Sequence, residues 1–262
     1  MAFLLYDGSF DGFLTVIFEC YSKRIEPTDI CKEEAFQENL FAGKTTVLSD
    51  RTKSGRVWTA LQKKLHPRNK RLPFIVFLSG SKGIEMKLYH FVRRIFDSNQ
   101  RIETDFGDHD VLDLKKIERV VLKESMRVQQ FLRFQQVRDG LFFAAVQPEY
   151  DVLPLSIEHF RNRFADQCWL IYDVRRDYGF YYDLSRVEEI VLSDKMFSIT
   201  NGKVPFRLLH EEEALYQSFW QNYFEHINIK ERKNQKQQLQ HMPRRYWRFL
   251  TEKNRTNSGT SQ

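Results

Sequence analysis

The sequence predicts an α+β protein with a mainly helical N-terminal part, an antiparallel β-β-α-β-β part and C-terminal helices. Before residue 131, apolar residues recur at helical spacing through several long segments. Between residues 134 and 183, two apolar runs, one amphipathic segment and two further runs follow one another. This order favours an antiparallel sheet with a helix on one face. The 262 residues are 42% hydrophobic and include 23 Phe, which is enough for a packed core.

Three parts of the chain are expected from these patterns. Residues 1–130 form the mainly helical part with short strands. Residues 131–250 form the α+β part, with β-β-α-β-β order to about residue 195 and helices after it. Residues 251–262 form a disordered tail, since they end in the polar run NRTNSGTSQ.

Composition bounds the partners and the compartment. The net charge of +6 and a pI near 9.1 favour polyanionic partners, because phosphates attract Lys and Arg. The three cysteines have no metal-ligand spacing, and their odd number argues against a disulfide framework. The seven histidines contain no H-x-x-x-H or H-E-x-x-H pair, so neither a metal nor a cofactor is expected. Without a signal peptide or a run of ~18 apolar residues, the chain is expected to be cytoplasmic and to have no membrane partner.

The elements of the first part follow from its apolar spacing and capping residues. In order, they are a strand (3–6), a helix (11–24), a polar loop with a short helix (26–41), a strand (44–48), a helix (53–65), a strand or the start of a helix (74–78), a helix (83–96) and a long basic helix (111–134). Ser9 or Asp11 is the expected cap of the first helix, and Asp50 caps the next one.

Three stretches of this part invite comparison with anion sites. The Asp-Gly pairs at residues 7–8 and 11–12 surround a helix N-terminus, although their carboxylates would oppose an anion and a structural turn is favoured. The SGSKG loop at residues 79–83 has the layout of a phosphate loop but lacks the G-x-x-x-x-G-K-[ST] spacing. The basic run at residues 66–73 either follows a phosphate backbone or is a solvated loop.

The second part is organised around residues 158–183, which are rich in arginine and aromatic residues. In order, its expected elements are a hairpin around Asp139-Gly140 (134–146), a helix capped by Ser156 (156–164), two strands (168–174 and 178–183) with an Arg pair at their connection, a strand or short helix (187–192), and an amphipathic helix (211–226) before a basic stretch that ends at residues 244–248. The hairpin connection therefore displays Arg175 and Arg176.

Three blocks resemble the bacterial "probable DNA metabolism protein" family and occur in that family's order. They are YDGSFDGFL, EHFRNRFADQCWLIYDVRRDYGFYYD and MPRRYWRFLTE. The resemblance implies uncharacterised biochemistry in DNA repair or modification and a partner of the radical-SAM class encoded beside it. It also implies likeness to domains fused ahead of a uracil-DNA-glycosylase-like domain. This chain lacks the C-x-x-x-C-x-x-C cluster of a radical-SAM enzyme, so such chemistry would come from a partner chain. The resemblance transfers no catalytic residue.

The leading hypothesis is a DNA-binding accessory or adaptor protein. Arginine binds phosphates with a bidentate fork, and aromatic rings stack on unpaired bases, which indicates single-stranded or damaged DNA. The candidate binding residues are Arg161, Arg163, Arg175, Arg176, Arg244, Arg245, Tyr246 and Trp247. The opposing interpretation pairs these arginines with neighbouring acids and places the aromatic residues in the sheet core.

Two other functions stay open. The chain could be an enzyme that acts on a nucleotide or damaged base through carboxylates in a cleft. Its candidate catalytic residues are Asp7, Asp11, His159 and Asp173, although a general base must also lie within reach of its substrate. Alternatively, the basic face meets a protein partner, and the chain is an interaction module that makes no direct contact with DNA.

Overall fold

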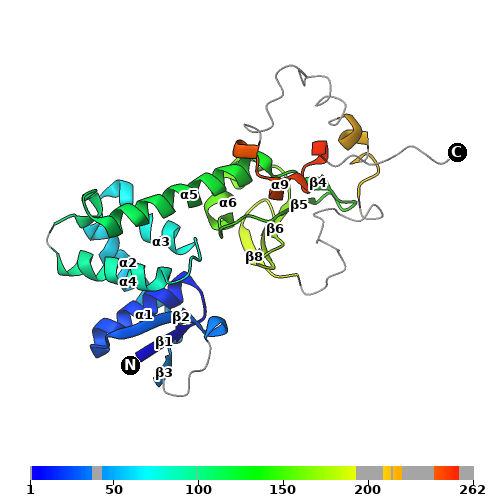
Figure 1. Cartoon of the computed structure of the whole chain (residues 1–262). Coiled ribbons are helices and arrows are strands. Elements are labelled where there is room, and N and C mark those ends of the chain that lie inside the picture. The colour runs from blue at the N-terminus through cyan, green and yellow to red at the C-terminus, as the bar shows by residue number, and fades with distance from the viewer. Residues whose placement is uncertain are drawn as a thin grey trace. The chain divides into compact units, whose positions relative to one another are not determined.

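The structure, a computed structural model, describes residues 2–36, 43–98, 100–192, 209–213, 215–219 and 239–253 (Figure 1). The α+β class is confirmed. The chain separates into two compact units, residues 1–122 and 123–262. The boundary lies within the long helix α5 (His109–Phe131), which also contains the boundary expected at residues 130 and 131.

The first unit contains a small parallel sheet and several helices. Its elements are β1 (Ala2–Tyr6), α1 (Phe10–Lys23), β2 (Pro27–Lys32), the 3-10 helix η1 (Glu33–Ala35), β3 (Gly43–Thr46), α2 (Arg51–Lys64), η2 (Pro67–Asn69), α3 (Leu72–Phe77), α4 (Ile84–Asp97), η3 (Ile102–Thr104) and the start of α5. The sheet has the order β2-β1-β3, and β1 is parallel to both neighbours. Leu4 in β1 pairs with Ile30 and Thr45, so the central strand carries buried apolar side chains into the core.

Two caps in this unit follow the sequence. The Ser9 hydroxyl accepts a hydrogen bond from the Gly12 amide at 2.9 Å and begins α1. The Asp50 carboxylate accepts from the amides of Thr52 and Lys53 at 2.8 and 3.2 Å and begins α2. Both predicted caps are therefore confirmed, because short polar side chains satisfy amides that a helix leaves free.

One prediction in this unit needs correction, and one alternative that the sequence left open is decided. Residues 27–32, expected to be loop, form β2, because pairing with β1 and burial of Ile30 outweigh the polar composition. Residues 74–78, given as a strand or the start of a helix, lie largely in helix α3. Pro73 fits the first turn of that helix, and short apolar runs do not distinguish strand from helix by periodicity.

The second unit is built on a five-stranded sheet. Its elements after α5 are β4 (Gln135–Gln136), β5 (Phe142–Val146), α6 (Leu153–Arg163), β6 (Trp169–Asp173), β7 (Tyr178–Tyr182), β8 (Val187–Ile190), α9 (Arg244–Trp247) and η7 (Thr251–Lys253). The strands lie in sequence order, and both predicted hairpins, β4–β5 and β6–β7, are antiparallel as expected.

The sheet is nevertheless mixed. Strands β5 and β6 are parallel, whereas an antiparallel sheet was expected, because α6 returns the chain across the sheet before β6 begins. The cap of α6 is Val152, and the expected cap Ser156 lies inside the helix. The Ser156 side chain is fully buried, and its hydroxyl lies 2.9 Å from the Ser125 hydroxyl.

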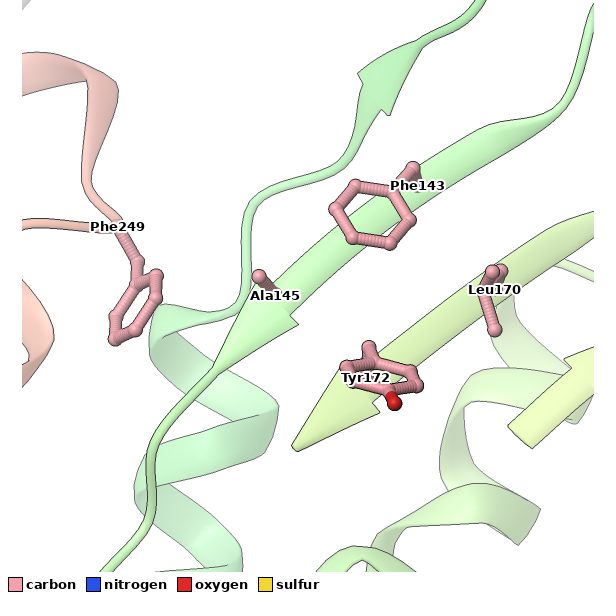
Figure 2. Close-up of a cluster of buried hydrophobic side chains, with 5 residues drawn as sticks. All are labelled: Phe143, Ala145, Leu170, Tyr172 and Phe249. Carbon is pink, nitrogen blue, oxygen red and sulfur yellow. The ribbon is translucent and has the colours of Figure 1, made fainter. Parts of the chain in front are cut away.

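One face of the sheet packs against the C-terminal segment. Phe143 and Ala145 of β5 and Leu170 and Tyr172 of β6 lie on this face, since alternate residues of a strand share a side. Figure 2 shows the Phe249 ring, which comes from the chain after α9, beside this group. The C-terminal segment is therefore part of the core of the second unit.

Some predictions fall on residues that lie outside the structure's description. Of the helix expected over residues 211–226, the structure assigns helix at Glu213 and residues 215–219, and residues 220–226 lie outside the described residues. Residues 254–262 of the expected tail also lie outside them. None of the helices described is both long and apolar enough to span a membrane.

Candidate nucleic-acid interface

The connection between β6 and β7 is organised by Asp173. This carboxylate is completely buried, and its Oδ1 accepts hydrogen bonds from the amides of Arg175 and Arg176 at 2.9 and 3.3 Å. Its Oδ2 accepts from Nη1 of Arg176 at 2.7 Å. Asp177 completes the turn with φ of 58°, and its carboxylate accepts from the Tyr172 hydroxyl at 2.9 Å. The acids of this hairpin therefore shape the turn.

The two arginines at this turn differ in how many of their N–H donors remain for a ligand. Arg176 is half-buried, and besides Asp173 it donates to the carbonyl oxygens of Pro148 and Glu149 at 3.3 and 3.0 Å. Arg175 is exposed and donates from Nη1 to the Glu149 carbonyl at 3.1 Å. Because a guanidinium has five N–H donors, Arg175 keeps donors for a ligand, whereas Arg176 ties the hairpin to the chain after β5.

Arg245 and Tyr246 meet a buried carboxylate on α5. The Glu124 side chain is 1% exposed and accepts from Nε and Nη2 of Arg245 at 3.1 and 2.6 Å. It also accepts from the Tyr246 hydroxyl at 2.9 Å, the Glu149 amide at 2.9 Å and Nη1 of Arg127 at 3.2 Å. Glu124 therefore fixes α9 against α5 within the second unit.

The electrostatics of this group keep Glu124 ionised. Burial acts to raise the pKa of Glu124, but the hydrogen bonds from Arg245, the Glu149 amide and Tyr246 outweigh it and lower the pKa below 4.5. Burial and the nearby charge of Glu124 raise the pKa of Tyr246, so its hydroxyl stays a donor. The Tyr246 ring is 1% exposed and therefore cannot stack on a base.

The remaining predicted cations form no ion pair within the part of the chain that the structure describes. Arg161 and Arg163 are exposed on α6, and neither forms an ion pair with a described residue. The Arg163 guanidinium lies 5.9 Å from the Phe164 ring. Arg244 is exposed, likewise without an ion pair among the residues described, and lies 6.0 Å from the Trp247 ring. These side chains can reach a ligand without breaking an ion pair with a described acid.

Two candidate residues with rings remain, Trp247 and His159. Trp247 is half-buried, donates from Nε1 to the Met242 carbonyl at 3.1 Å, and has the Lys253 ammonium 5.0 Å from its ring. His159 is exposed on α6 and contacts the Phe160 ring edge-on. Trp247 is thus the one residue of the proposed set with a partly exposed ring for stacking.

The N-terminal carboxylates form a hydroxyl network in the first unit, whereas His159 and Asp173 belong to the second. Asp7 Oδ1 accepts from the amide and hydroxyl of Ser9 at 2.9 and 2.7 Å, and Oδ2 accepts from the Ser49 hydroxyl at 2.6 Å. Asp11 accepts from the Ser54 hydroxyl at 2.7 Å. Burial acts to raise the pKa of Asp7, but the bonds from Ser49 and Ser9 outweigh it and lower the pKa.

Gly12 explains the second Asp-Gly pair. A Cβ at this position would lie 2.3 Å from Asp7 Oδ1 and 2.7 Å from the Ser49 hydroxyl, so only glycine fits beside the network. The favoured interpretation of this stretch as a structural turn agrees with these contacts. Among the described residues, no group of three or more His, Cys, Asp or Glu could hold a metal ion.

Sequence reasoning did not single out Glu124 or Glu149, which organise the arginine contacts. Glu124 lies in a basic helix, 121 positions before Arg245, and its pattern in the sequence is that of a solvated acid. Its burial follows from packing between segments far apart in the chain. The spacing of residues around Glu124 therefore could not have predicted its burial.

Comparison with known proteins identifies a family without a described activity. The family model "Domain of unknown function (DUF4130)" matches residues 82–252, which include the second and third of the three sequence blocks. The curated proteins and the solved structures give no match. Because the family model covers more than half of the chain, the protein belongs to this family of domains of unknown function, DUF4130.

Proposed function

We propose that the chain binds DNA through exposed arginines of its second unit. The observation that carries this proposal is that four of the six candidate arginines are exposed and form no ion pair with a described acid: Arg161, Arg163, Arg175 and Arg244. An exposed guanidinium contacts a phosphate at little desolvation cost and releases a condensed counterion from the DNA. The net charge of +6 acts in the same direction.

Phosphate contacts supply most of the affinity in this proposal. Tyr246 is buried, which leaves Trp247 as the candidate ring for stacking on unpaired bases. A preference for single-stranded or damaged DNA therefore depends on Trp247. Binding by phosphate contacts alone is independent of sequence and strongly salt-dependent.

The role proposed for DNA binding is that of an accessory or adaptor protein in repair or modification. It rests on the resemblance to the "probable DNA metabolism protein" family, which implies a radical-SAM partner. The chain would bring DNA to that partner, and the partner would supply the chemistry. Co-purification with and without nuclease tests this step, since a complex that survives nuclease is held by protein contacts, whereas a complex lost with nuclease is held by DNA. If no complex forms in either case, the adaptor role is excluded.

The enzyme alternative has one supporting observation. Asp7 and Ser49 follow β1 and β3, at the carboxyl edge of a parallel sheet, where ligands commonly bind in α/β folds. Against it, both oxygens of Asp7 already accept hydrogen bonds, and its lowered pKa makes it a weak base at neutral pH. The geometry therefore favours the binding proposal.

Removing two of the free arginines tests DNA binding. An Arg161→Gln/Arg163→Gln variant of the full chain is titrated against labelled DNA at several salt concentrations, with fluorescence anisotropy as the readout. Each lost contact to duplex DNA lowers the salt slope by ~0.9 and, at 0.1 M salt, the affinity by about eightfold.

A Lys23→Gln/Lys87→Gln variant is the matched control. It removes the same charge from exposed lysines that are already paired with Glu19 and Asp113. The proposal expects a clear loss in the arginine variant and little change in the control. Unchanged affinity and an unchanged salt slope in the arginine variant would refute the proposal. Equal losses in both variants would show that only the net charge of the protein matters.

A further inference from the structure

The stretch of the first unit from residue 51 to residue 84 contains no Asp or Glu. Nine cations lie in it: Arg51, Lys53, Arg56, Lys63, Lys64, Arg68, Lys70, Arg71 and Lys82. Its centre is KKLHPRNKR, residues 63–71, which joins α2 to α3 through η2. Positive charge is therefore concentrated in this stretch, although Lys53 near its start is paired with Glu19 and Asp50.

This centre is anchored at several points, unlike a solvated linker. Leu65 and Leu72 are buried at 2% and 0% exposure on either side of η2. The His66 amide donates to the buried carboxylate of Glu103 at 2.8 Å. The Asn69 side chain, also buried, accepts from the Lys115 ammonium of α5 at 2.7 Å. The backbone that carries the cations is thus fixed on both sides and beneath.

Most cations of the centre remain available on this fixed frame. Lys64 is used internally, because its ammonium donates to the carbonyl oxygens of residues 95, 96 and 98 at the end of α4. Lys63, Arg68 and Arg71 are exposed and Lys70 is half-buried, and none forms an ion pair with a described residue. A rigid frame lowers the entropy lost when such side chains meet a charged partner.

Helix α5 adds a further cation beside this segment. Lys115 marks the contact through Asn69, and Arg119 lies one helical turn further on the same face. Arg119 is exposed and has no ion pair with the described acids, while the neighbouring Glu118 is held by Lys115 at 3.0 Å. The Asn69–Lys115 hydrogen bond therefore brings the helix that carries Arg119 against the segment that carries the other cations.

We infer that residues 63–71 and Arg119 form a contact surface for the phosphate backbone of double-stranded DNA. Regular negative charge of high density is the complement of a fixed row of unpaired cations. Duplex DNA is favoured over single strands because residues 63–71 contain no Phe, Tyr or Trp that could stack on unpaired bases. The surface belongs to the first unit and does not depend on the arginines proposed in the second.

The test uses the full chain with Arg68→Gln/Arg71→Gln, a labelled duplex and a single strand of the same length. Each phosphate contact contributes ~0.9 to the salt slope on duplex DNA, so two losses lower the slope by ~1.8 and the affinity at 0.1 M salt by about 60-fold. Lys23→Gln/Lys87→Gln is the charge-matched control. Lys63→Gln/Arg119→Gln provides a second variant on other elements, and circular dichroism checks that each variant folds.

The expected result is a weaker and less salt-dependent duplex complex for both surface variants, with the control close to the parent. Duplex affinity within twofold of the parent for folded surface variants would overturn the inference, as would an equal loss in the control. Reduced binding to anionic lipid vesicles with unchanged DNA affinity would assign the surface to membranes and also overturn it. The Arg161→Gln/Arg163→Gln variant is measured in parallel, so that a failure of this inference can be distinguished from a failure of the proposed function.

Discussion

Replacing Glu124 by Gln removes the buried negative charge on which several donors of the second unit converge. The Glu124 carboxylate accepts from Arg245, Tyr246, Arg127 and the Glu149 amide, and its side chain is 1% exposed. Glutamine keeps the shape but presents an amide N–H₂ group where donors converge. Arg245 would then be left with the more exposed Glu149 carboxylate at 3.2 Å.

The expected loss is large because one partner of a buried pair disappears while the other remains. Breaking such a pair costs ~3–5 kcal/mol of unfolding free energy. Urea unfolding followed by circular dichroism measures the loss, and amide hydrogen exchange of residues 244–250 shows whether α9 detaches. Glu188→Gln is the control, because its ion pair with Arg186 is exposed and contributes ~0–1 kcal/mol. A loss at Glu124 no larger than at Glu188 would refute the argument.

The lowered pKa of Glu124 also predicts how the stability of the folded protein changes with pH. The folded-state pKa of Glu124 lies below 4.5, its value in an unfolded chain, so its stabilisation is complete above pH 4.5. The stabilisation declines as the pH falls from 4.5 through the folded-state pKa. The difference in stability between the parent and Glu124→Gln should therefore narrow below pH 4.5, and a difference that widens there would contradict the sign.

Further expectations concern the first unit. Gly12→Ala should cost ~1–3 kcal/mol, because its Cβ would lie 2.3 Å from Asp7 Oδ1, whereas Gly55→Ala, with no atom within 4 Å, should be neutral or stabilising in urea unfolding. Asp50→Ala should cost ~1 kcal/mol through loss of its two amide bonds, and no change in the urea midpoint would argue against the cap. Burial raises the pKa of Cys20 to about 12, so mass spectrometry should find it unalkylated at pH 8 in the native protein and alkylated in urea.

Local signals predicted much of the fold. The caps at Ser9 and Asp50, the Asp139-Gly140 hairpin and the hairpin through Arg175 and Arg176 depend on residues adjacent in the chain, and the structure contains each of them. Two of the errors depend on pairing at a distance. Strand β2 is defined by its register with β1, and the parallel direction of β6 is defined by its pairing with β5. Neither pairing leaves a pattern within its own segment.

The ion pairs of the candidate interface likewise divide into local ones and ones between distant parts of the chain. The pairing of Arg176 with Asp173 is local, three residues apart, and the sequence supplied it as an alternative to DNA binding. The pairing of Arg245 with Glu124 spans 121 positions and could not be found by inspecting neighbouring acids. Conversely, the acids nearest to Arg161 and Arg163 form no described ion pair with them, although their proximity in sequence left neutralisation open as an alternative.

These contrasts are the reason that the proposal of DNA binding selects arginines by their exposed charge and not by local composition. Residues 158–183 contain both kinds of arginine: Arg176 is fixed by a fully buried carboxylate, while Arg161 has no acidic partner among the described residues. The segment 63–71 contains no acid. Its Lys64 ammonium has internal partners, but these are carbonyl oxygens and not carboxylates. Because phosphate binding requires cations that give up no stronger partner, both exposed sets qualify by the same physical criterion.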